Sequence, residues 1–433
     1  MAILNPMSTR FFGGISLPGD KKTGKSAIEV MPSPKKVYLH LSQHTGNPTQ
    51  PLVKKGDIVK IGTKIGESDG FISVPIHASI AGKVVSVAQH PHPILGSSLC
   101  YIIESTGNDE WEPSIKEDPH YENLAPEDLL VRIKDAGIVG LGGGAFPTHV
   151  KLSPPDEKPI DTLIINGCEC EPMLSTDHRL MLEYSTGIIE GAKIFQKILN
   201  TEKLIFAIED NKKDAAEILR TDGVMVRLLR TKYPQGAERQ LIKTLLGREV
   251  PKGSLPMDIG CVVQNVATCY AAFQATKFHK PLVDRVITVT GDGVKESKNI
   301  LIRIGTPAID AINYCGGYTG EPKMIIFGGP MTGTAQYSEN VPVIKATTGI
   351  IIWSKAKTEH EGPCVRCGQC VDVCPMGLMP TEIYNCVKHN IFEKTEVLGI
   401  LDCIECGCCA YACPAKIPLV HYLKYGKHEV RRR

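Results

Sequence analysis

The spacing of apolar residues divides the chain into regions of different type. Between residues 37 and 105, short β-rich runs (VYLHL, DIVKI, GKVVSV and LCYII) are separated by glycine and proline turns, and this pattern predicts an all-β block. From about residue 120 to 280, helices and strands alternate. TLIIN (162–166) and KLIFAI (203–208) are apolar enough for buried strands of a parallel sheet, and MVRLLR (225–230) predicts a third strand.

Helical patterns accompany these strands. APEDLLVRIKDAG has Pro126 and two acidic residues in its first turn, apolar residues at 129, 130 and 133, and Gly137 at its end, which is typical of one helix. Helices that alternate with buried strands predict an α/β sandwich. Further helical stretches are expected around 177–199, 212–221, 235–246 and 261–277.

The stretch after residue 285 has a different pattern. VITVTGDGVKESKNILIRIGTPAIDAIN (286–313) predicts a strand, an Asp-Gly turn, a second strand and a helix opened by Pro307, and MIIFGGPMTGTA follows it. This is the pattern of a small β-grasp-like unit. Nothing in it indicates catalysis, so we expect a packing or docking module.

Composition narrows the class of protein. With 433 residues, 42% of them apolar and 22% charged, the chain is expected to be a soluble globular protein of roughly two to four domains. Its net charge of +2 gives no reason to expect nucleic acid. The basic tail from Lys424 to Arg433 is interpreted as a solvated end, with docking to an acidic partner or an anionic membrane as the alternative.

The chain carries no sign of a membrane span or a secretion signal. No segment approaches the roughly 18 consecutive apolar residues needed to cross a bilayer. The first residues, MAILNPMSTRFFGG, lack the basic-then-apolar order of a signal peptide. We therefore expect a cytoplasmic chain with reduced thiols, in which 16 cysteines indicate metal rather than disulfides.

The strongest chemical signal is a pair of cysteine motifs. Residues 364–375 read CVRCGQCVDVCP and residues 403–414 read CIECGCCAYACP. Both fit C-x2-C-x2-C-x3-C-P, the bacterial ferredoxin run, in which the fourth cysteine of each motif reaches the other cluster. The spacing predicts two [4Fe–4S] clusters, one held by Cys364, Cys367, Cys370 and Cys413, the other by Cys403, Cys406, Cys409 and Cys374.

The alternative interpretation of these motifs is a pair of zinc sites. Zinc prefers two C-x2-C pairs separated by about a dozen residues or more, which does not match three cysteines in seven positions repeated twice. Cys408 breaks the spacing and is expected to be a spare thiol. Two clusters in one domain form a one-electron conduit, so another part of the chain is expected to supply it with electrons.

The glycine-rich stretch VGLGGGAFPTHVK (139–151) is a candidate anion site. It fits the G-x-G-x-x-G/A dinucleotide fingerprint, but that fingerprint requires a strand that leads into the glycines. Here a helix ends at Gly137, and the strand follows the loop at 162–166. A phosphate cradle remains reasonable, because glycines let backbone amides approach an anion, a turn near Pro147 offers its N-terminus, and Lys151 adds a charge. A plain structural loop is the alternative.

The all-β block resembles a biotinyl/lipoyl-type barrel-sandwich over KKGDIVKIGTKIGESDGFISVPIHASIAGKVVSV. Carrier domains of that family have a lysine at a hairpin tip that takes the cofactor. The matching tip here, residues 67–71, reads ESDGF and has no lysine. We therefore expect a structural module rather than a swinging arm.

Taken together, the order of modules resembles the RnfC subunit of the Rnf complex, the ion-translocating ferredoxin:NAD+ oxidoreductase, over nearly the whole chain. The central part is also similar to the NADH-binding flavoprotein subunit of respiratory complex I. The resemblance implies a multidomain α/β protein. Its expected parts are an N-terminal segment (1–36), a barrel-sandwich hybrid (37–108), a Rossmann-like α/β FMN/NADH domain (120–280), a β-grasp (SLBB-like) domain (281–350) and a C-terminal two-cluster ferredoxin-like domain (355–433).

The resemblance also implies the residues that bind FMN and NAD(H). The family loop G-R-G-G-x-G-F-P-T-x-x-K stands here as GLGGGAFPTHVK, with Leu141 in place of the arginine and Ala145 in place of a glycine. The family stretch N-x-D-E-x-E-P stands as NGCECEP, with Cys168 in place of the aspartate, and N-N-V-x-T stands as QNVAT. The paired glutamates after Y-G-A-G map loosely onto YPQGAE, where only Glu238 remains.

These stretches supply the candidate cofactor residues. Gly142, Gly143 and Gly144 are assigned to the FMN phosphate with Lys151 as its charged partner, and Phe146 to the nicotinamide side. Asn166 suits a flavin contact and Glu171 the nucleotide. The full set of cofactor-binding candidates is Gly140, Gly142, Gly143, Gly144, Phe146, Lys151, Asn166, Glu169, Glu171, Glu238, Asn265 and Thr268.

The function implied by the resemblance is electron entry or exit. NADH would give a hydride to FMN, which would release electrons singly to the two clusters, so no side chain is expected to act as a catalytic acid or base. The implied partners are the membrane subunits of the Rnf complex and its ferredoxin-like B subunit. The chain, without a transmembrane segment of its own, would be peripheral on the inner face of the cell membrane.

Two alternatives stay open at this point. The cobalamin-reducing flavoprotein of propanediol microcompartments shares these modules, but its cluster motifs are expected between the α/β and β-grasp parts, whereas here they follow the β-grasp. The other alternative is an electron-relay or docking subunit without nucleotide binding, which the departures at Leu141 and Cys168 keep open.

Overall fold

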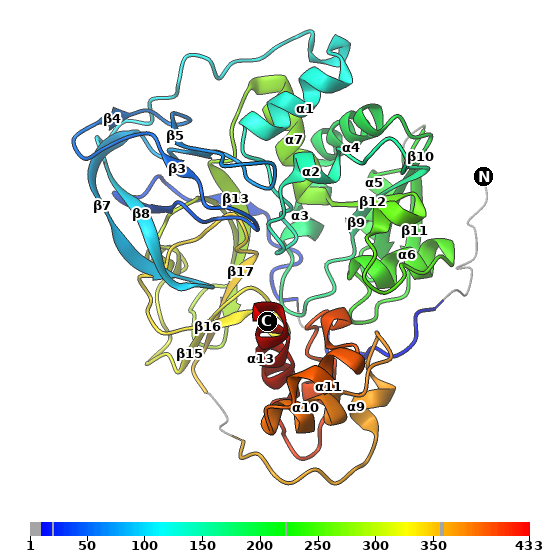
Figure 1. Cartoon of the computed structure of the whole chain (residues 1–433). Helices are drawn as coiled ribbons and strands as arrows, with labels where there is room; N and C mark the ends of the chain where they lie inside the picture. Colours follow the sequence, from blue (N-terminus) through cyan, green and yellow to red (C-terminus); the bar gives the residue numbers. More distant parts are fainter. Residues whose placement is uncertain (1–9, 20, 221–222, 356–358) are drawn as a thin grey trace.

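The computed structural model describes residues 10–19, 21–220, 223–355 and 359–433 (Figure 1). Parts of three predicted regions lie outside the described residues: 1–9 and 20 of the N-terminal segment, 221 of the predicted helix 212–221, and 356–358 of the predicted cluster domain. No described helix combines the length and the apolar character that a bilayer crossing requires.

The predicted all-β block forms two facing sheets. One has the order β2-β8-β7-β4 and the other β3-β5-β6, and both are antiparallel throughout. Val37, Leu39 and Ile103 alternate along their strands and are fully buried between the sheets. The strands are β2 (Lys36–His40), β3 (Gln50–Pro51), β4 (Ile58–Val59), β5 (Lys64–Glu67), β6 (Ile76–His77), β7 (Gly82–His92) and β8 (Gly96–Ser105).

The α/β region is built on a four-stranded parallel sheet of order β11-β10-β9-β12. Its strands are β9 (Thr162–Gly167), β10 (Lys203–Glu209), β11 (Met225–Leu229) and β12 (Cys261–Asn265). The helices of this region are α1 (Pro126–Asp135), α2 (Thr148–Lys151), α3 (Thr176–Glu183), α4 (Ser185–Leu199), α5 (Lys213–Ile218), α6 (Glu238–Leu246) and α7 (Val266–Phe278), with short 3-10 turns η1 (Tyr121–Asn123) and η2 (Pro256–Ile259).

Two expectations for this region need correction. The stretch 261–277 was expected to be helical throughout, but its first five residues form β12, because an apolar run that completes a buried parallel sheet cannot be told from a buried helix by periodicity alone. The expected single stretch 177–199 is two helices, α3 and α4, that meet at Tyr184. The predicted absence of a strand before the glycine loop is confirmed, since α1 precedes it.

The β-grasp-like region forms a six-stranded sheet of order β1-β14-β13-β17-β15-β16. The expected strand, turn, strand and helix are confirmed, and Pro307 caps the helix. An edge strand comes from the N-terminal segment, which pairs in parallel with β14. The elements are β1 (Ile28–Val30), β13 (Asp284–Gly291), β14 (Lys298–Arg303), α8 (Ala308–Tyr314), β15 (Met324–Phe327), β16 (Thr334–Gln336) and β17 (Gly349–Trp353).

The cysteine-rich region is a small helical unit that packs below the α/β region in Figure 1. Its elements are α9 (Gln369–Asp372), α10 (Pro380–Lys388), α11 (Phe392–Val397), η3 (Ile400–Asp402), α12 (Cys408–Ala412) and α13 (Leu419–Arg432). The basic tail continues α13, and its last three residues, Arg431, Arg432 and Arg433, are exposed, as the sequence suggested. Earlier in the tail, Lys427 is held instead, because it donates to the Cys403 carbonyl (2.6 Å) and to Glu405 (3.0 Å).

Candidate functional site

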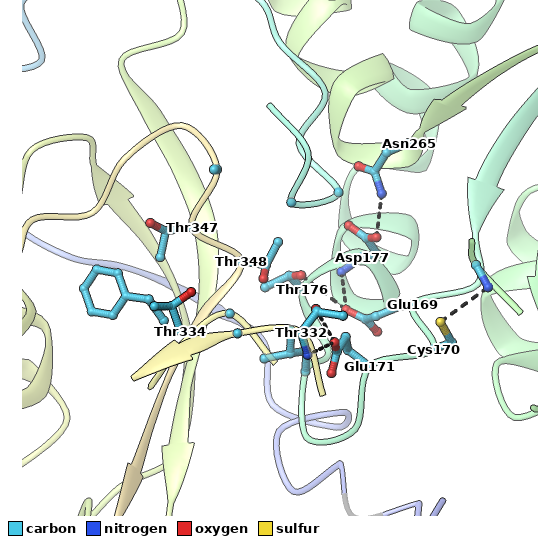
Figure 2. Close-up of a pocket in the computed structure, with 18 of the residues that line it drawn as sticks. Glu169, Cys170, Glu171, Thr176, Asp177, Asn265, Thr332, Thr334, Thr347 and Thr348 are labelled. Atoms are coloured by element: carbon cyan, nitrogen blue, oxygen red, sulfur yellow. Dashed lines mark hydrogen bonds between the residues drawn. The ribbon is translucent and has the colours of Figure 1, made fainter. Parts of the chain in front are cut away.

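The main cavity lies between the α/β sheet and the six-stranded sheet. Its volume is about 240 Å³. Figure 2 shows Asn265, Asp177 and Glu169 on one side and Thr334, Thr347 and Thr348 on the other. The cavity is therefore made mainly by two domains, with Pro93 and Ile94 of the barrel-sandwich at its edge, and no domain encloses it alone.

Two asparagines occupy the carboxyl ends of adjacent parallel strands at this cavity. Asn166 ends β9 and Asn265 ends β12, and the two residues are direct partners in the strand register. From β9 the chain adds β10 and β11 on one side and then returns to add β12 on the other side. The strand order therefore reverses between β9 and β12. Open α/β sheets bind ligands at such a point.

The glycine loop forms one wall of the cavity beside these asparagines. Gly142 and Gly143 line the cavity, and Gly143 has a φ of +105°, which side chains rarely allow. A Cβ on Gly142 would meet Asn265 Nδ2 at 3.4 Å, whereas in the described part of the chain only Thr348, at 4.0 Å, would be near a Cβ on Gly143. The bare backbone thus faces open space, as a phosphate cradle requires.

A helix N-terminus supports this wall, but it belongs to a different helix from the one expected. The turn after Pro147 is only the four-residue α2. The N-terminus of the thirteen-residue α7 lies beside Gly142, and Asn265 caps it by accepting from Ala267 N (2.8 Å). The amide of Leu141 donates to Thr268 Oγ1 (2.9 Å), which fixes the loop to this helix. Loop and helix together offer backbone donors to an anion.

The Glu169 and Asp177 carboxylates lie deep in the cavity. Glu169 accepts from the Asp177 amide (2.7 Å) and pairs with Lys21 (3.4 Å). Asp177 Oδ2 accepts from Asn265 Nδ2 (2.7 Å). Burial, with a smaller contribution from Glu169, raises the pKa of Asp177 to about 7. One side of the cavity can therefore hold or release a proton near neutral pH.

Glu171 joins the two domains that form the cavity. Its carboxylate accepts from the amides of Met331 (3.1 Å) and Thr332 (2.9 Å) in the β15–β16 loop. Lys21, from the N-terminal segment, donates to the carbonyls of Glu171 (3.2 Å) and Leu174 (2.5 Å). Burial raises the pKa of Glu171 despite these donors. The residue holds the opposite wall in place in addition to lining the cavity.

Two buried cations fix the loops on both sides. Arg285 donates to the carbonyl of Leu141 (3.1 Å) in the glycine loop and to the carbonyl of Lys345. The Lys345 ammonium donates to the carbonyls of Pro75 (3.0 Å) and Gly137 (2.8 Å), and burial lowers its pKa to about 7. Its neighbours in the same loop, Ile344, Ala346, Thr347 and Thr348, line the cavity. Barrel-sandwich, α/β and β-grasp domains therefore meet at one rigid junction.

Half of the predicted cofactor residues face the cavity. These are Gly142, Gly143, Asn166, Glu169, Glu171 and Asn265. Three of the others are engaged elsewhere in the protein: Lys151 pairs with Glu238 (2.6 Å) and donates to the Val263 carbonyl (3.2 Å), and Thr268 is fully buried. Outside the lining lie Gly140, Gly144, Phe146, Lys151, Glu238 and Thr268.

The sequence interpretation missed the wall opposite the glycine loop. Thr332, Thr334, Thr347 and Thr348 come from the β-grasp domain, which was expected to serve only for packing or docking. The sequence signal for Thr332 and Thr334 is the polar, glycine-rich stretch GGPMTGTA after an apolar strand, and Thr347 and Thr348 lie outside that stretch. Cys170, in the stretch NGCECEP, also lines the cavity, and its sulfur accepts from Gly236 N (3.3 Å).

The second cysteine set surrounds a small cavity in the helical unit. Cys374, Cys403, Cys406 and Cys409 all line it, so the fourth cysteine of the first motif joins three from the second. The amides of Leu378 and Glu405 each lie 3.4 Å from a sulfur of this set, Cys374 and Cys403 respectively. The donor set and the amides directed at sulfur fit a [4Fe–4S] cluster.

The first cysteine set lies nearer the surface. Cys364 and Cys367 are exposed, while Cys370 and Cys413 are buried in one apolar cluster. The two motifs share one backbone path, with left-handed residues at corresponding positions: Arg366 and Glu405, Gly368 and Gly407, Gly377 and Lys416. The sequence repeat is thus a structural repeat. Cys408 is buried and lines the cavity of the second set.

The second cysteine set and the main cavity are close neighbours. Tyr233 donates its hydroxyl to the carbonyl of Cys406 (2.8 Å). A Cβ on Gly407 would lie 3.0 Å from the carbonyl of Met331, whose amide donates to Glu171. Gln240 donates to the Pro375 carbonyl (3.1 Å) and Gly14 N to the Val373 carbonyl (2.8 Å). The helical unit is therefore held against the wall of the cavity.

Comparison with known families assigns each region. The family models that match are the RnfC barrel sandwich hybrid domain over residues 9–108, the Nuo51 FMN-binding domain over 133–274, the SLBB domain over 286–335 and the 4Fe-4S dicluster domain over 363–417. The predicted fold class, an FMN-binding domain and a dicluster domain are confirmed by these matches.

Curated relatives agree with this assignment, and a solved structure shares the fold. The chain is 47% identical to the C subunit of the proton-translocating ferredoxin:NAD+ oxidoreductase complex of Clostridium ljungdahlii, over 98% of this chain and 95% of that one. It is 43% identical to the Na+-translocating counterpart of Acetobacterium woodii, over 99% and 98%. An NAD+-reducing [NiFe]-hydrogenase shares the fold alone, with a TM-score of 0.50 and 16% identity over 73% of this chain and 63% of that one.

The relatives match nearly end to end, and the domain models follow the same order as the domains of the structure. The chain therefore belongs to the family of RnfC subunits of ion-translocating ferredoxin:NAD+ oxidoreductase complexes, and it carries a Nuo51-type FMN-binding domain and a 4Fe-4S dicluster domain.

Proposed function

We propose that this chain passes electrons between NAD(H), an FMN in the main cavity and two [4Fe–4S] clusters. The observation that carries the proposal is the contact between the cavity wall and the second cysteine set through Tyr233 and Met331. When bound, FMN accepts a hydride and gives up its electrons one at a time. The protein supplies the position of each group.

The residues that would hold FMN are those that face the cavity. The amides of Gly142 and Gly143, with the N-terminus of α7, offer donors to the phosphate. Asn166 and Asn265 each use one Nδ2 hydrogen internally, toward the Gly236 carbonyl (2.9 Å) and Asp177 (2.7 Å), and each amide has a second hydrogen for a ligand. Glu169 and Glu171 keep this wall fixed.

We further propose an order for the two clusters. A cluster held by Cys374, Cys403, Cys406 and Cys409 would lie beside the cavity and would exchange electrons with it directly. The cluster of Cys364, Cys367, Cys370 and Cys413 has two exposed ligands and would exchange electrons with a partner. The chain would then be a wire with one end in the cavity and the other at the surface.

The surface end defines the partners in this proposal. The membrane subunits of the complex and its ferredoxin-like B subunit would dock at the face that exposes Cys364 and Cys367. The chain would lie in the cytoplasm, peripheral on the inner face of the membrane. Relatives named for proton and for Na+ translocation are both similar to this chain, and the ion is moved by those partners in the proposal.

An absorption experiment tests the proposal. The full chain, purified without oxygen and loaded with FMN, is expected to contain about eight irons. Addition of NADH should bleach the flavin band and then the broad iron–sulfur band. A chain that holds its iron but neither binds FMN nor responds to NADH would instead be an electron-relay subunit.

A further inference from the structure

The tip of the β7–β8 hairpin extends from the barrel-sandwich to the main cavity. Pro93 and Ile94, at this tip, line the cavity together with residues of the α/β and β-grasp domains. A third domain thus reaches the site. From its sequence this domain is expected to be only structural, because its other hairpin tip, residues 67–71, has no lysine.

A buried histidine gives the tip a fixed shape. The Nδ1 atom of His92 accepts from the amides of Ile94 (3.1 Å) and Leu95 (3.0 Å). Its proton must therefore be on Nε2, which lies 2.9 Å from the Ser42 carbonyl and donates to it. Burial lowers the pKa of His92 and keeps the ring neutral. The turn is thus built around one tautomer.

The tip is also fastened to the opposite wall of the cavity. Gln336, in β16, donates to the Pro93 carbonyl (3.1 Å), and Tyr337 donates its hydroxyl to the Gly96 carbonyl (2.7 Å). Thr334, in the same strand, lines the cavity. Because both ends of the turn are held, the position of Ile94 relative to the cavity does not depend on a flexible loop.

Ile94 differs from the deep lining residues in exposure. Its side chain is 64% exposed, whereas Asp177 is buried between the Asn265 amide and Glu169. A rigid turn that presents an isoleucine at the edge of a cavity offers apolar area for a ligand to cover, because ligand sites are lined mostly by apolar side chains. A resident group fills the deep part first, so the outer residue contacts the ligand that enters last.

We propose that Ile94, supported by Pro93, forms an apolar contact for the nicotinamide dinucleotide that docks at the mouth of the cavity. The contact would cover one face of a planar ring and exclude water from it. The inference rests on the proposed function, and it makes the barrel-sandwich domain a part of the dinucleotide site.

Binding of NAD+ to the oxidised, FMN-loaded full chain tests the proposal, because no electron transfer then obscures the affinity. Ile94→Asp and Leu95→Asp form a matched pair: Leu95 is the next residue, is 57% exposed and does not line the cavity. We expect the Kd for NAD+, measured by calorimetry, to rise roughly tenfold in I94D through loss of apolar contact, with little change in L95D. Ile94→Val should stay close to wild type.

The FMN content and the far-ultraviolet circular dichroism of each variant show whether the fold and the deep site persist. Equal NAD+ affinity of I94D and L95D, in a wild type that binds NAD+, would overturn this inference and leave the proposed function intact. A wild type that binds FMN but no NAD+ would overturn both.

Discussion

Replacement of Gly143 by alanine tests the phosphate cradle at its most constrained position. Gly143 has a φ of +105°, and among the described residues the only atom near an added Cβ would be Thr348 Cγ2 at 4.0 Å. The methyl group therefore fits in space, and the cost is in the backbone. A non-glycine residue held in a rarely populated region costs about 1–3 kcal/mol.

The loop can avoid this cost only by rotating its peptide groups away from the cavity. The amides would then no longer point at the phosphate. If the whole strain energy is lost from binding, the Kd for FMN should rise by roughly five- to a hundredfold. The neighbouring Gly144 offers a matched control, because its φ is not in the strained region and no atom of the residues that the structure describes lies within 4 Å of an added Cβ. Gly144→Ala should bind FMN within about twofold of wild type.

The assay is a titration of FMN-free chain, followed by the quenching of flavin fluorescence, with iron content measured in parallel. Iron should be unchanged in both variants, since the cysteine sets lie in a separate helical unit. If G143A bound FMN as tightly as wild type and G144A, the glycine loop would not be the cradle, and the reasoning from its backbone would be refuted.

Two further predictions follow from the site. Cys374→Ser should remove about four of eight irons, because Cys374 completes the set of the second motif, whereas Cys408→Ser should keep all of them; equal iron in both variants would disprove the exchange of cysteines between motifs. Asp177 has a pKa raised to about 7 in the folded protein, so the fold retains a proton that the unfolded chain loses near pH 4. Stability should therefore fall by about 2–4 kcal/mol as the pH rises from about 4 to 7. Asp177→Asn should reduce the difference in Tm between about pH 5 and pH 8, and an unchanged difference would show that Asp177 is not the titrating group.

The sequence predicted most of the fold because its signals are local. Pro126, Pro307 and Gly137 mark helix ends, and the apolar runs 162–166 and 203–208 can be covered on both faces only inside a parallel sheet. The cysteine spacing likewise carries its own geometry. The run 261–265 was misassigned, because a buried strand and a buried helix have the same apolar composition.

The site was predicted only in part because half of it is made by contacts between domains. The glycines and the two asparagines lie at ends of local elements, so their motifs could be found. The hairpin tip at Ile94, the threonines of the β-grasp domain and the ties made by Arg285 are distant in sequence and carry no motif. Lys151 was expected to face a phosphate, and its pairing with Glu238 depends on how α2 and α6 pack.

The central claim is that the cluster beside the cavity lies between the flavin and the surface cluster. Rapid mixing of FMN-loaded Cys403→Ala and Cys364→Ala chains with NADH, followed by absorption and electron paramagnetic resonance, tests it most directly. The claim predicts that NADH bleaches the flavin in both variants. C364A should still reduce the cluster beside the cavity at the wild-type rate, whereas C403A should not reduce the surface cluster that it retains. Reduction of the remaining cluster in C403A at the wild-type rate would contradict the claim.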